Sequence, residues 1–464
     1  MRYFILGAKS EPKEGFIKMS ATRKLAEFIS GLRYEHISID AIAKAKLSLM
    51  DWTGVTIGGY VSGQNDMDSM INALSPFFGR PQATLITKKK KIDVINAALI
   101  NGTASHLLDY DDVHMGMIGH PTVPVIPAAL AMGEYHGING KKLIEAIVAG
   151  VETECRIGEA VNPEHYATGW HATATLGCFG ACAAVAKIID LEADKIVSAL
   201  GIAGTQACGL QQSFGTMCKP FHAGKAASNG ILAAILAGNE LTAPQQILEA
   251  QAGFGKVLSP KFDETKIDNL GQPFEIEGVV YKRYASCYLT HAAIVCMLGI
   301  REKYHPTISK VENVQVKVSS TALAVADKSE PQTGLEGKFS LKYCVTLALV
   351  KGKVTESDFT DEALKEPAIK RMMPKVNVTV EEPFAPTEVE IKMYLSDGGE
   401  IKENLELTSK DLSIPVGEWE LTLQHKISDL LNRALPPKST RKIINDIMRL
   451  EEVGNIRDIV ELLS

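Results

Sequence analysis

The sequence predicts a mostly α-helical protein with a large helical domain and a smaller α+β domain. In residues 1–270 apolar side chains recur at spacings of three and four, which is typical of helices. After about residue 270 valines alternate with polar residues, as at Val314, Val316 and Val318, which is typical of half-buried strands. The helical spacing returns after about residue 419, so helices are also expected at the carboxyl end.

Helices in the first region are separated by proline and glycine, which mark the turns. Their expected ranges are 92–108, 125–135, 141–161, 172–189, 193–205, 225–238 and 245–258. Two segments within them, 175–184 and 226–230, are rich in glycine, alanine and other small residues. Because small side chains let helix axes approach closely, we expect these two helices at the centre of a compact domain.

The second region combines strands with helices. Antiparallel strands are expected at 314–318, 376–380 and 389–395, with a hairpin signal at 397–399, and helices at 332–349 and 361–372. The resulting domain limits are 1–270 for the first part of the large helical domain, 271–405 for the α+β domain and 406–464 for the last segment. We expect helices of that segment, at 421–435, 440–450 and 455–463, to rejoin the helical domain or to cap the smaller one.

Composition excludes several classes of protein. The chain has 464 residues, 45% of them hydrophobic and 22% charged, with a formal net charge of −6. This balance argues against a nucleic-acid partner, because a phosphate backbone is usually met by a basic patch. No apolar run reaches the ~18 residues of a membrane span. Early charges at Arg2, Lys9 and Lys13, without an apolar run between them, argue against a signal peptide.

Cysteine spacing bears on metal binding and on compartment. The eight cysteines form no CxxC pair and stand at positions 155, 178, 182, 208, 218, 287, 296 and 344. Several of them fall in apolar helical stretches, which indicates buried free thiols of a cytoplasmic protein. The same spacing argues against a zinc site.

The densest polar cluster lies between two predicted apolar helices. It places three histidines and three carboxylates close together: His106, Asp109, Asp111, Asp112, His114 and His120. Near a core such groups cost free energy unless they are paired, so a reactive site is one interpretation. A solvated helix end is an equally weighted alternative. Metal binding is a third, with weaker support because the spacing shows no order.

Three further clusters carry candidate ligand groups: 169–173 with His171, 218–225 with Lys219 and His222, and 281–291 with Lys282, Cys287 and His291. Lys219 stands at the start of a predicted helix, and helix N-termini bind anions. The third cluster lies where the periodicity changes, and clefts between domains are favoured ligand sites. Both lysines would suit a substrate with carboxylates. The ordinary alternatives are a structural histidine, an exposed turn lysine and a charged linker.

Taken in order, these segments resemble the MmgE/PrpD family over nearly the whole chain. The resemblance is carried by LDYDD at 108–112, HP at 120–121 with VIP at 125–127, GWH at 169–171, KPFHAGKAA at 219–227, AGFG at 252–255, KRYASC at 282–287 with TH at 290–291, and FSLKY at 339–343. Seven ordered segments make a specific match.

Membership of this family would imply a large helical domain built from both chain ends, with a smaller α+β lid inserted before the C-terminal helices. The active site would lie between the two domains, and a homodimer would be usual. The activities implied are 2-methylcitrate dehydratase in propionate metabolism, cis-aconitate decarboxylase and iminodisuccinate epimerase. No metal, iron–sulfur cluster or other cofactor is implied.

The resemblance also implies roles for individual residues. His120 becomes the leading general acid/base, with Tyr343 as a second proton donor. His171, Lys219 and Lys282 would hold carboxylates of a di- or tricarboxylate, and Asp109 would orient or charge a neighbouring imidazole. His222 and His291 are further candidates for substrate binding.

Two positions depart from the decarboxylase pattern: Val113 stands where those enzymes have Thr, and Cys287 where they have His. Both changes remove groups that could contact substrate, so we rank itaconate formation below dehydration. The leading hypothesis is a hydro-lyase resembling 2-methylcitrate dehydratase, and the second is an epimerase, in which Cys287 would be an acid/base. A carboxylate-binding protein without catalysis ranks last.

Overall fold

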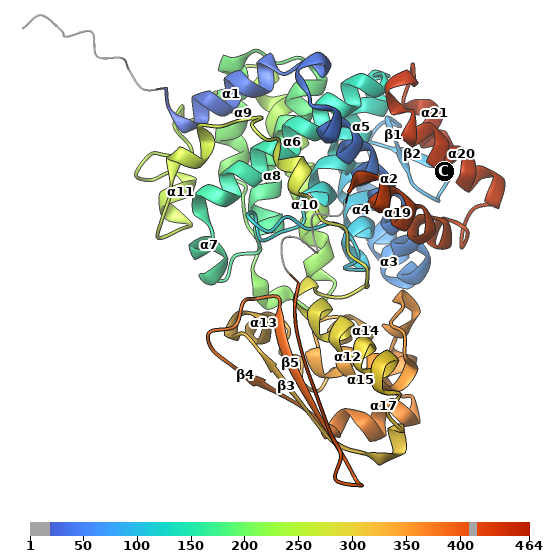
Figure 1. Cartoon of the computed structure of the whole chain (residues 1–464). Helices are drawn as coiled ribbons and strands as arrows, with labels where there is room; N and C mark the ends of the chain where they lie inside the picture. Colours follow the sequence, from blue (N-terminus) through green and yellow to red (C-terminus); the bar gives the residue numbers. More distant parts are fainter. Residues whose placement is uncertain (1–18, 408–414) are drawn as a thin grey trace, which may run out of the picture.

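A computed structural model describes residues 19–407 and 415–464 (Figure 1). The amino-terminal charges at Arg2, Lys9 and Lys13 lie outside the described residues. A large helical body fills one end of the molecule, and a smaller body with a sheet and helices lies below it. This arrangement confirms the predicted fold class.

The large body is built from long helices in the first 240 residues. They are α1 (Ala21–Gly31), α2 (Ile39–Ser62), α3 (Gln64–Leu74), α4 (Val94–Leu107), α5 (Thr122–His136), α6 (Gly140–Val161), α8 (Ala172–Ile188), α9 (Ala193–Gly204) and α10 (Cys218–Gly238), with short α7 (Glu164–Ala167) and α11 (Phe254–Val257). A two-stranded hairpin, β1 (Ala83–Leu85) and β2 (Lys90–Ile92), joins α3 to α4 and was not predicted.

Close packing of α10 against α4 and α8 forms the centre of this body. A Cβ on Gly224 would lie 2.0 Å from the Leu99 carbonyl oxygen of α4, and one on Gly230 would lie 2.5 Å from the Cys182 nitrogen of α8. Only glycine permits such an approach of two backbones. The segments 175–184 and 226–230 therefore pack closely at the centre of the large body, as their composition predicted.

Two predicted helices differ in extent from those observed. The segment 245–258 is mostly turns, with only α11 helical, because Pro244, Gly253 and Gly255 interrupt a short apolar run. Helix α10 begins at Cys218, seven residues before the predicted start at 225. Pro220 is compatible with this longer helix because it stands in the first turn, where a missing N–H breaks no helical bond.

The smaller body contains a four-stranded sheet in the order β4-β3-β5-β6. Its strands are β3 (Val311–Val318), β4 (Val376–Val380), β5 (Glu388–Leu395) and β6 (Glu400–Glu406). The predicted hairpin joins β5 to β6, and β3–β5 is also antiparallel. The expectation of antiparallel pairing is wrong for β3–β4, which is parallel because helices cross over between the two strands.

The crossover helices are α13 (Ser320–Val325), α14 (Gly334–Gly337), α15 (Leu341–Lys351), α16 (Asp361–Leu364) and α17 (Pro367–Met372), whereas α12 (His291–Tyr304) precedes β3. The predicted helix 332–349 is thus divided into α14 and α15, with Ser340 as the N-cap of α15. The predicted helix 361–372 is divided before Pro367, which cannot donate to a preceding turn.

The carboxyl end returns to the large body through α19 (Val416–Leu431), α20 (Pro437–Met448) and α21 (Arg457–Leu462). Trp419, Ile427 and Ile443 belong to the same hydrophobic core as α2 and α6. A second core, under the sheet, is formed only by residues between Ala285 and Met393. The chain therefore leaves the large body near residue 282, builds the smaller body and comes back.

No helix in the two described ranges has the length and apolar character needed to cross a bilayer. All eight cysteines are free, and six of them are buried, whereas Cys208 and Cys218 are exposed.

Candidate active site

The loop that joins α4 to α5 carries the densest polar cluster into the interior. His106 lies in the last turn of α4, and His120 precedes Pro121, the N-cap of α5. Between them Asp109 has a left-handed backbone with φ 49°, which turns the loop sharply after the helix. Asp109, Asp111 and His106 are almost completely buried. The loop is therefore a part of the protein interior rather than a solvated helix end.

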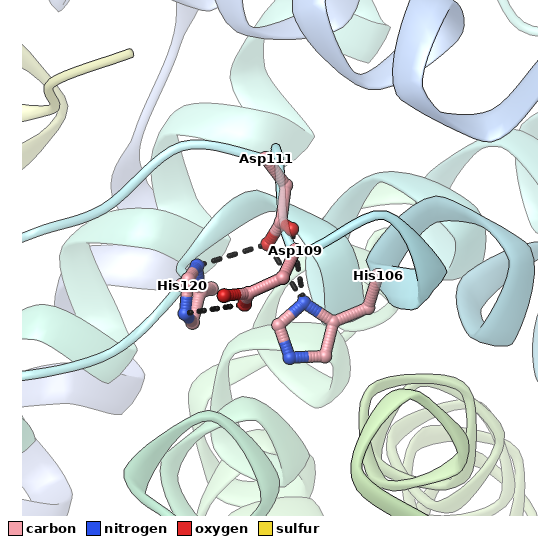
Figure 2. A group of neighbouring side chains, drawn as sticks. All are labelled: His106, Asp109, Asp111 and His120. Carbon is pink, nitrogen blue, oxygen red and sulfur yellow. Dashed lines mark hydrogen bonds and ion pairs between the residues drawn. The ribbon is translucent and has the colours of Figure 1, made fainter. Parts of the chain in front are cut away.

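One carboxylate, Asp111, orients two imidazoles (Figure 2). Its Oδ2 lies 2.9 Å from Nδ1 of His106 and 3.0 Å from Nδ1 of His120. Nδ1 of His120 also lies 2.8 Å from the carbonyl oxygen of Asp112. Both neighbours of this nitrogen are acceptors, so Nδ1 of His120 carries the proton and Nε2 presents a lone pair.

His106 has the same tautomer for a different reason. Its Nε2 lies 2.8 Å from Nζ of Lys219, an ammonium that can only donate. Nδ1 of His106 therefore carries the proton that Asp111 accepts. Burial lowers the pKa of His106 to about 3, and Lys219 acts in the same direction against the opposing effect of Asp111. His106 is thus a neutral bridge between a carboxylate and a lysine.

Asp109 is the anion that holds two lysines. Its Oδ1 lies 2.7 Å from Nζ of Lys219 and 3.2 Å from Nζ of Lys282. Burial acts to raise the pKa of Asp109, but the two ammonium groups outweigh it and hold that pKa well below its usual range. Asp109 is also 3.8 Å from Nε2 of His120. It thus stays ionised and supplies negative charge beside this imidazole.

A cavity of about 200 Å³ opens in front of this cluster. Its polar end is formed by Asp109, His120, His171 and Lys219, and Thr173 lies beside them. The rest of the lining is mostly apolar and comes from both bodies: Val113, Met115 and Ile118 from the loop, and Leu289, Val325, Phe339 and Pro386 from the smaller body, with the Phe339 ring 5.3 Å from Nζ of Lys219. The cavity is therefore a site between the two domains with one charged end.

His120 is the basic group best placed to act in this cavity. It lines the cavity, and 13% of its side chain is exposed. Burial lowers its pKa below the ordinary value, although Asp111 opposes the shift. A neutral imidazole with its Nδ1 proton held behind it and a lone pair in front has the form of a general base.

His171 and His222 form a second imidazole pair, with 3.1 Å between their Nδ1 atoms. His171 lines the main cavity, whereas His222 lines a neighbouring one. Burial lowers the pKa of both, to about 4 for His222 and well below the ordinary value for His171, and Lys219 adds to the effect. Both rings are therefore neutral donors or acceptors.

The remaining predicted residues lie further from the charged end. Cys287 lines the main cavity, and burial, followed by the charge of Asp109, raises the pKa of its thiol to about 11. Tyr343 is not brought to the cluster, since it belongs to the core of the smaller body and its hydroxyl donates to the Asp358 carbonyl at 2.6 Å. His291 is buried among Tyr284 and Tyr288 rather than in the cavity wall.

Metal binding deserves a separate test, because ligand atoms of His106, Asp109, Asp111 and His120 lie within 4.8 Å of one another. Two lysines, Lys219 and Lys282, already balance the negative charge of the two carboxylates, and Lys219 also donates to Nε2 of His106. A divalent cation would meet two ammonium groups at short range. The donor set therefore fits an internal charge network better than a metal centre.

Four residues of this network were absent from the predicted site: His106, Asp111, Lys338 and Lys426. His106 and Asp111 belong to the polar cluster between the two predicted helices, and the alternation of histidine and carboxylate in that cluster is a sequence signal for both residues. Lys338 and Lys426 approach the loop from parts of the chain that are 230 and 316 residues away from their partners. No local pattern indicates such contacts.

Two models of known protein domains match this chain. The MmgE/PrpD N-terminal domain matches residues 23–266, and the MmgE/PrpD C-terminal domain matches residues 284–450. Both domains of a two-domain family are thus present, and the chain belongs to the MmgE/PrpD family.

Relatives with assigned activities fall into two groups. A cis-aconitate decarboxylase of Aspergillus terreus is 25% identical, with 96% of each chain covered. The cis-aconitate decarboxylase of Homo sapiens is 24% identical, over 96% of this chain and 95% of the relative. A probable 2-methylcitrate dehydratase of Saccharomyces cerevisiae is 23% identical, over 72% of this chain and 69% of the relative.

Proposed function

We propose that this protein is a cofactor-independent lyase of small di- or tricarboxylates that works by proton transfer at a carbon next to a carboxylate. The observation that carries the proposal is the pairing of a neutral base with a cation at one end of an interdomain cavity. His120 presents Nε2 there, and Nζ of Lys219 lies in the same wall. Relatives named as a decarboxylase and a dehydratase support a lyase.

In the proposed reaction Nε2 of His120 takes the proton alpha to a substrate carboxylate. The electron pair moves onto that carboxylate, and the enolate-like charge is stabilised by the ammonium of Lys219. In a dehydration, collapse of this enolate forms the C=C bond and expels hydroxide from the neighbouring carbon, which leaves as water with the proton that His120 took. Lys282 lies behind Asp109 and supports this electrostatic field through it. His171, which has a buried Nε2 without a hydrogen-bond partner, is suited to bind a carboxylate or a leaving hydroxyl group.

Dehydration of a 2-methylcitrate-like substrate is the outcome we favour. The lining of the cavity includes Val113, Ile118, Leu289 and Val325, against which a methyl group could be placed without leaving a polar group unpaired. Decarboxylation of cis-aconitate is the second candidate, because the relatives matched over 96% of this chain have that name. An epimerase that uses Cys287 is less favoured, since a thiol with a raised pKa is a poor base.

Proton NMR of the purified protein in D2O tests the reaction class. The panel is 2-methylcitrate, citrate, cis-aconitate, malate and iminodisuccinate. An alkene formed from a hydroxy acid establishes a dehydratase, and itaconate establishes a decarboxylase. Deuterium uptake without a new carbon skeleton establishes an epimerase. Binding without turnover across the whole panel would favour the non-catalytic alternative and contradict the proposal.

The His120→Asn variant tests the proposed base. We expect turnover to fall by about 10²–10⁴-fold, the usual range for loss of a general base, with the fold intact. His305→Asn is a matched control, because His305 is exposed at the end of α12 and has a left-handed backbone that Asn accepts. Near-normal turnover of His120→Asn would reject the assigned role.

Assembly and location are parts of the same proposal. We propose a homodimer, as the family resemblance implies, and size-exclusion chromatography with light scattering tests it. We also propose a cytoplasmic location. One relative, from Yarrowia lipolytica, is named as mitochondrial, so fractionation of cells that express the tagged protein is the relevant measurement.

A further inference from the structure

Three consecutive carbonyl groups in the site loop each accept a hydrogen bond from a different lysine. Nζ of Lys338 lies 2.6 Å from the oxygen of Leu108, Nζ of Lys282 lies 2.8 Å from that of Asp109, and Nζ of Lys426 lies 2.7 Å from that of Tyr110. We call Lys338, Lys282 and Lys426 the lysine clamp. They come from the smaller body, from the connection between the bodies, and from α19.

The residues whose carbonyls accept these bonds, Leu108, Asp109 and Tyr110, lie where the chain leaves helix α4. Leu108 is the C-cap of α4, so its carbonyl has no helical partner. Asp109 has φ 49°, a left-handed conformation that costs aspartate less than most residues but still depends on its surroundings. The clamp supplies those surroundings, because each ammonium makes a charge-assisted bond to one carbonyl of the turn.

Lys338 is costly to bury, and its contacts do not explain its presence through stability. It is 3% exposed, and among the residues the structure describes it has no ion pair with a carboxylate. Its second acceptor is the carbonyl of Ala285 at 3.1 Å, and the ring of Phe359 lies 5.1 Å away. Replacing Lys338 by an apolar side chain would remove the desolvation cost of the charge but would leave the carbonyls of Leu108 and Ala285 without this donor. A positional role accounts better for a lysine here.

Lys426 links the loop to two further elements. Its Nζ lies 2.6 Å from Oδ1 of Asp51 in α2 and 3.3 Å from the carbonyl of Lys282, and it stands 3.8 Å from the centre of the Tyr110 ring. Lys338 and Lys426 therefore each bond both to the site loop and to the segment 282–285. That segment carries Lys282, which contacts the carboxylate of Asp109.

We infer that Lys338 and Lys426 are positioning residues that hold Asp109 in its left-handed turn, with its carboxylate between Lys219 and Lys282. Through them the smaller body and the C-terminal helix set the geometry of the reacting groups without touching the substrate. The effect on turnover rests on the proposed function, whereas the effect on the loop does not.

The Lys338→Met variant separates positioning from simple stabilisation. We expect the melting temperature to change only slightly, because the desolvation cost of a buried cation is removed while the carbonyls of Leu108 and Ala285 lose a donor. Hydrogen–deuterium exchange in a peptide spanning 107–115 should become about tenfold faster, since a charge-assisted bond to the loop is lost. With a substrate from the panel, kcat should fall by about 100-fold, as expected for misplaced groups, while KM changes by less than about threefold.

The matched control is Lys303→Met, because the Lys303 side chain is 63% exposed and pairs with Glu403 on the surface of the smaller body. It should leave exchange and turnover unchanged. For Lys426, a single change would leave Asp51 buried without its partner, so the double variant Asp51→Asn, Lys426→Met is used. We expect faster exchange in the same peptide and a similar loss of kcat.

The inference is overturned if Lys338→Met lowers the melting temperature while exchange in 107–115 and kcat stay as in the wild type. That result would make Lys338 a structural residue only. If the wild-type protein turns over none of the panel, the proposed function fails, and the exchange measurement still decides the role of the clamp.

Discussion

At the scale of single residues, the site depends on which nitrogen of each histidine carries a proton. Asp111 accepts from Nδ1 of both His106 and His120, and this contact leaves Nε2 of His120 as the lone pair that faces the cavity. The carboxylate of Asp109 forms ion pairs with Lys219 and Lys282. The orientation of the proposed base therefore comes from Asp111 together with the Asp112 carbonyl, while Asp109 supplies charge.

The Asp111→Asn variant tests this division of roles. An amide can donate as well as accept, so His120 can change its tautomer or turn its ring. We expect kcat to fall by about 100-fold or more, with a smaller change in KM, as for loss of acid–base function. Asp397→Asn, in the exposed hairpin of the smaller body, should leave both parameters unchanged. A rise of about 100-fold in KM with an unchanged kcat would contradict the role assigned to Asp111.

The pH dependence of activity follows from the lowered pKa of His120. Burial disfavours the imidazolium, so the base form persists below the ordinary pKa of about 6.5. Protonation removes the base as the pH falls through the folded-state value. A plot of kcat/KM against pH should therefore stay level down to about pH 6.5 and decrease only below it. An acid limb centred above pH 6.5 would show that a different group is titrating.

At the scale of elements, the close contact of α4 with α10 places the two halves of the charged end. Helix α4 carries His106, and α10 carries Lys219 in its first turn. The glycines at 102 and 224 face each other, so a Cβ on Gly102 would lie 2.7 Å from Cα of Gly224. The bond between Lys219 and His106 depends on this short separation.

The Gly224→Ala variant should separate α4 from α10. The new methyl group would meet the carbonyl of Leu99 at 2.0 Å, so the backbones must move apart. We expect a loss of about 1–3 kcal/mol in the free energy of unfolding, measured by urea denaturation. Gly299→Ala in α12 is the control, because nothing lies within 4 Å of its Cβ position. That change should stabilise by up to about 1 kcal/mol.

At the scale of the whole molecule, the two ends of the chain meet in one core. Ile427 of α19 fills the groove beside Gly54 of α2, and Lys426 next to it reaches Asp51 and the site loop. The smaller body is thus inserted between two segments of the large one. The C-terminal helices reach the site loop through Lys426 of α19, which donates to the carbonyl of Tyr110.

Truncating Ile427 should therefore weaken the whole fold. Ile427 is completely buried, so Ile427→Ala is expected to cost about 2–5 kcal/mol in the free energy of unfolding. Leu421 lies in the same helix but is 63% exposed, and Leu421→Ala should change that free energy by less than about 0.5 kcal/mol. Similar values for both variants would mean that α19 does not contribute to the core.

Prediction from sequence succeeded where the signal was local. The spacing of apolar residues located α4, α5, α6, α8 and α9 to within a few residues, and the small residues of α8 and α10 indicated their close packing. It failed at 245–258, where a short apolar run resembles a helix but turn-forming residues decide the backbone. The parallel pairing of β3 with β4 depends on a crossover that strand patterns do not record.

The sequence by itself determined the fold class, the family and the loop that bears the polar cluster, because periodicity and ordered motifs are properties of neighbouring residues. Only the tertiary structure decided which hydrogen bonds and ion pairs the residues of that cluster form. It placed Asp111 between two imidazoles, removed Tyr343 to the core of the smaller body and brought Lys338 and Lys426 to consecutive carbonyls. The physical reason is that proton positions and buried charges are set by contacts that exist only after the chain has folded. Some of these contacts join near neighbours, such as Asp111 and His106, and others span 230 or 316 residues, as those of Lys338 and Lys426 do.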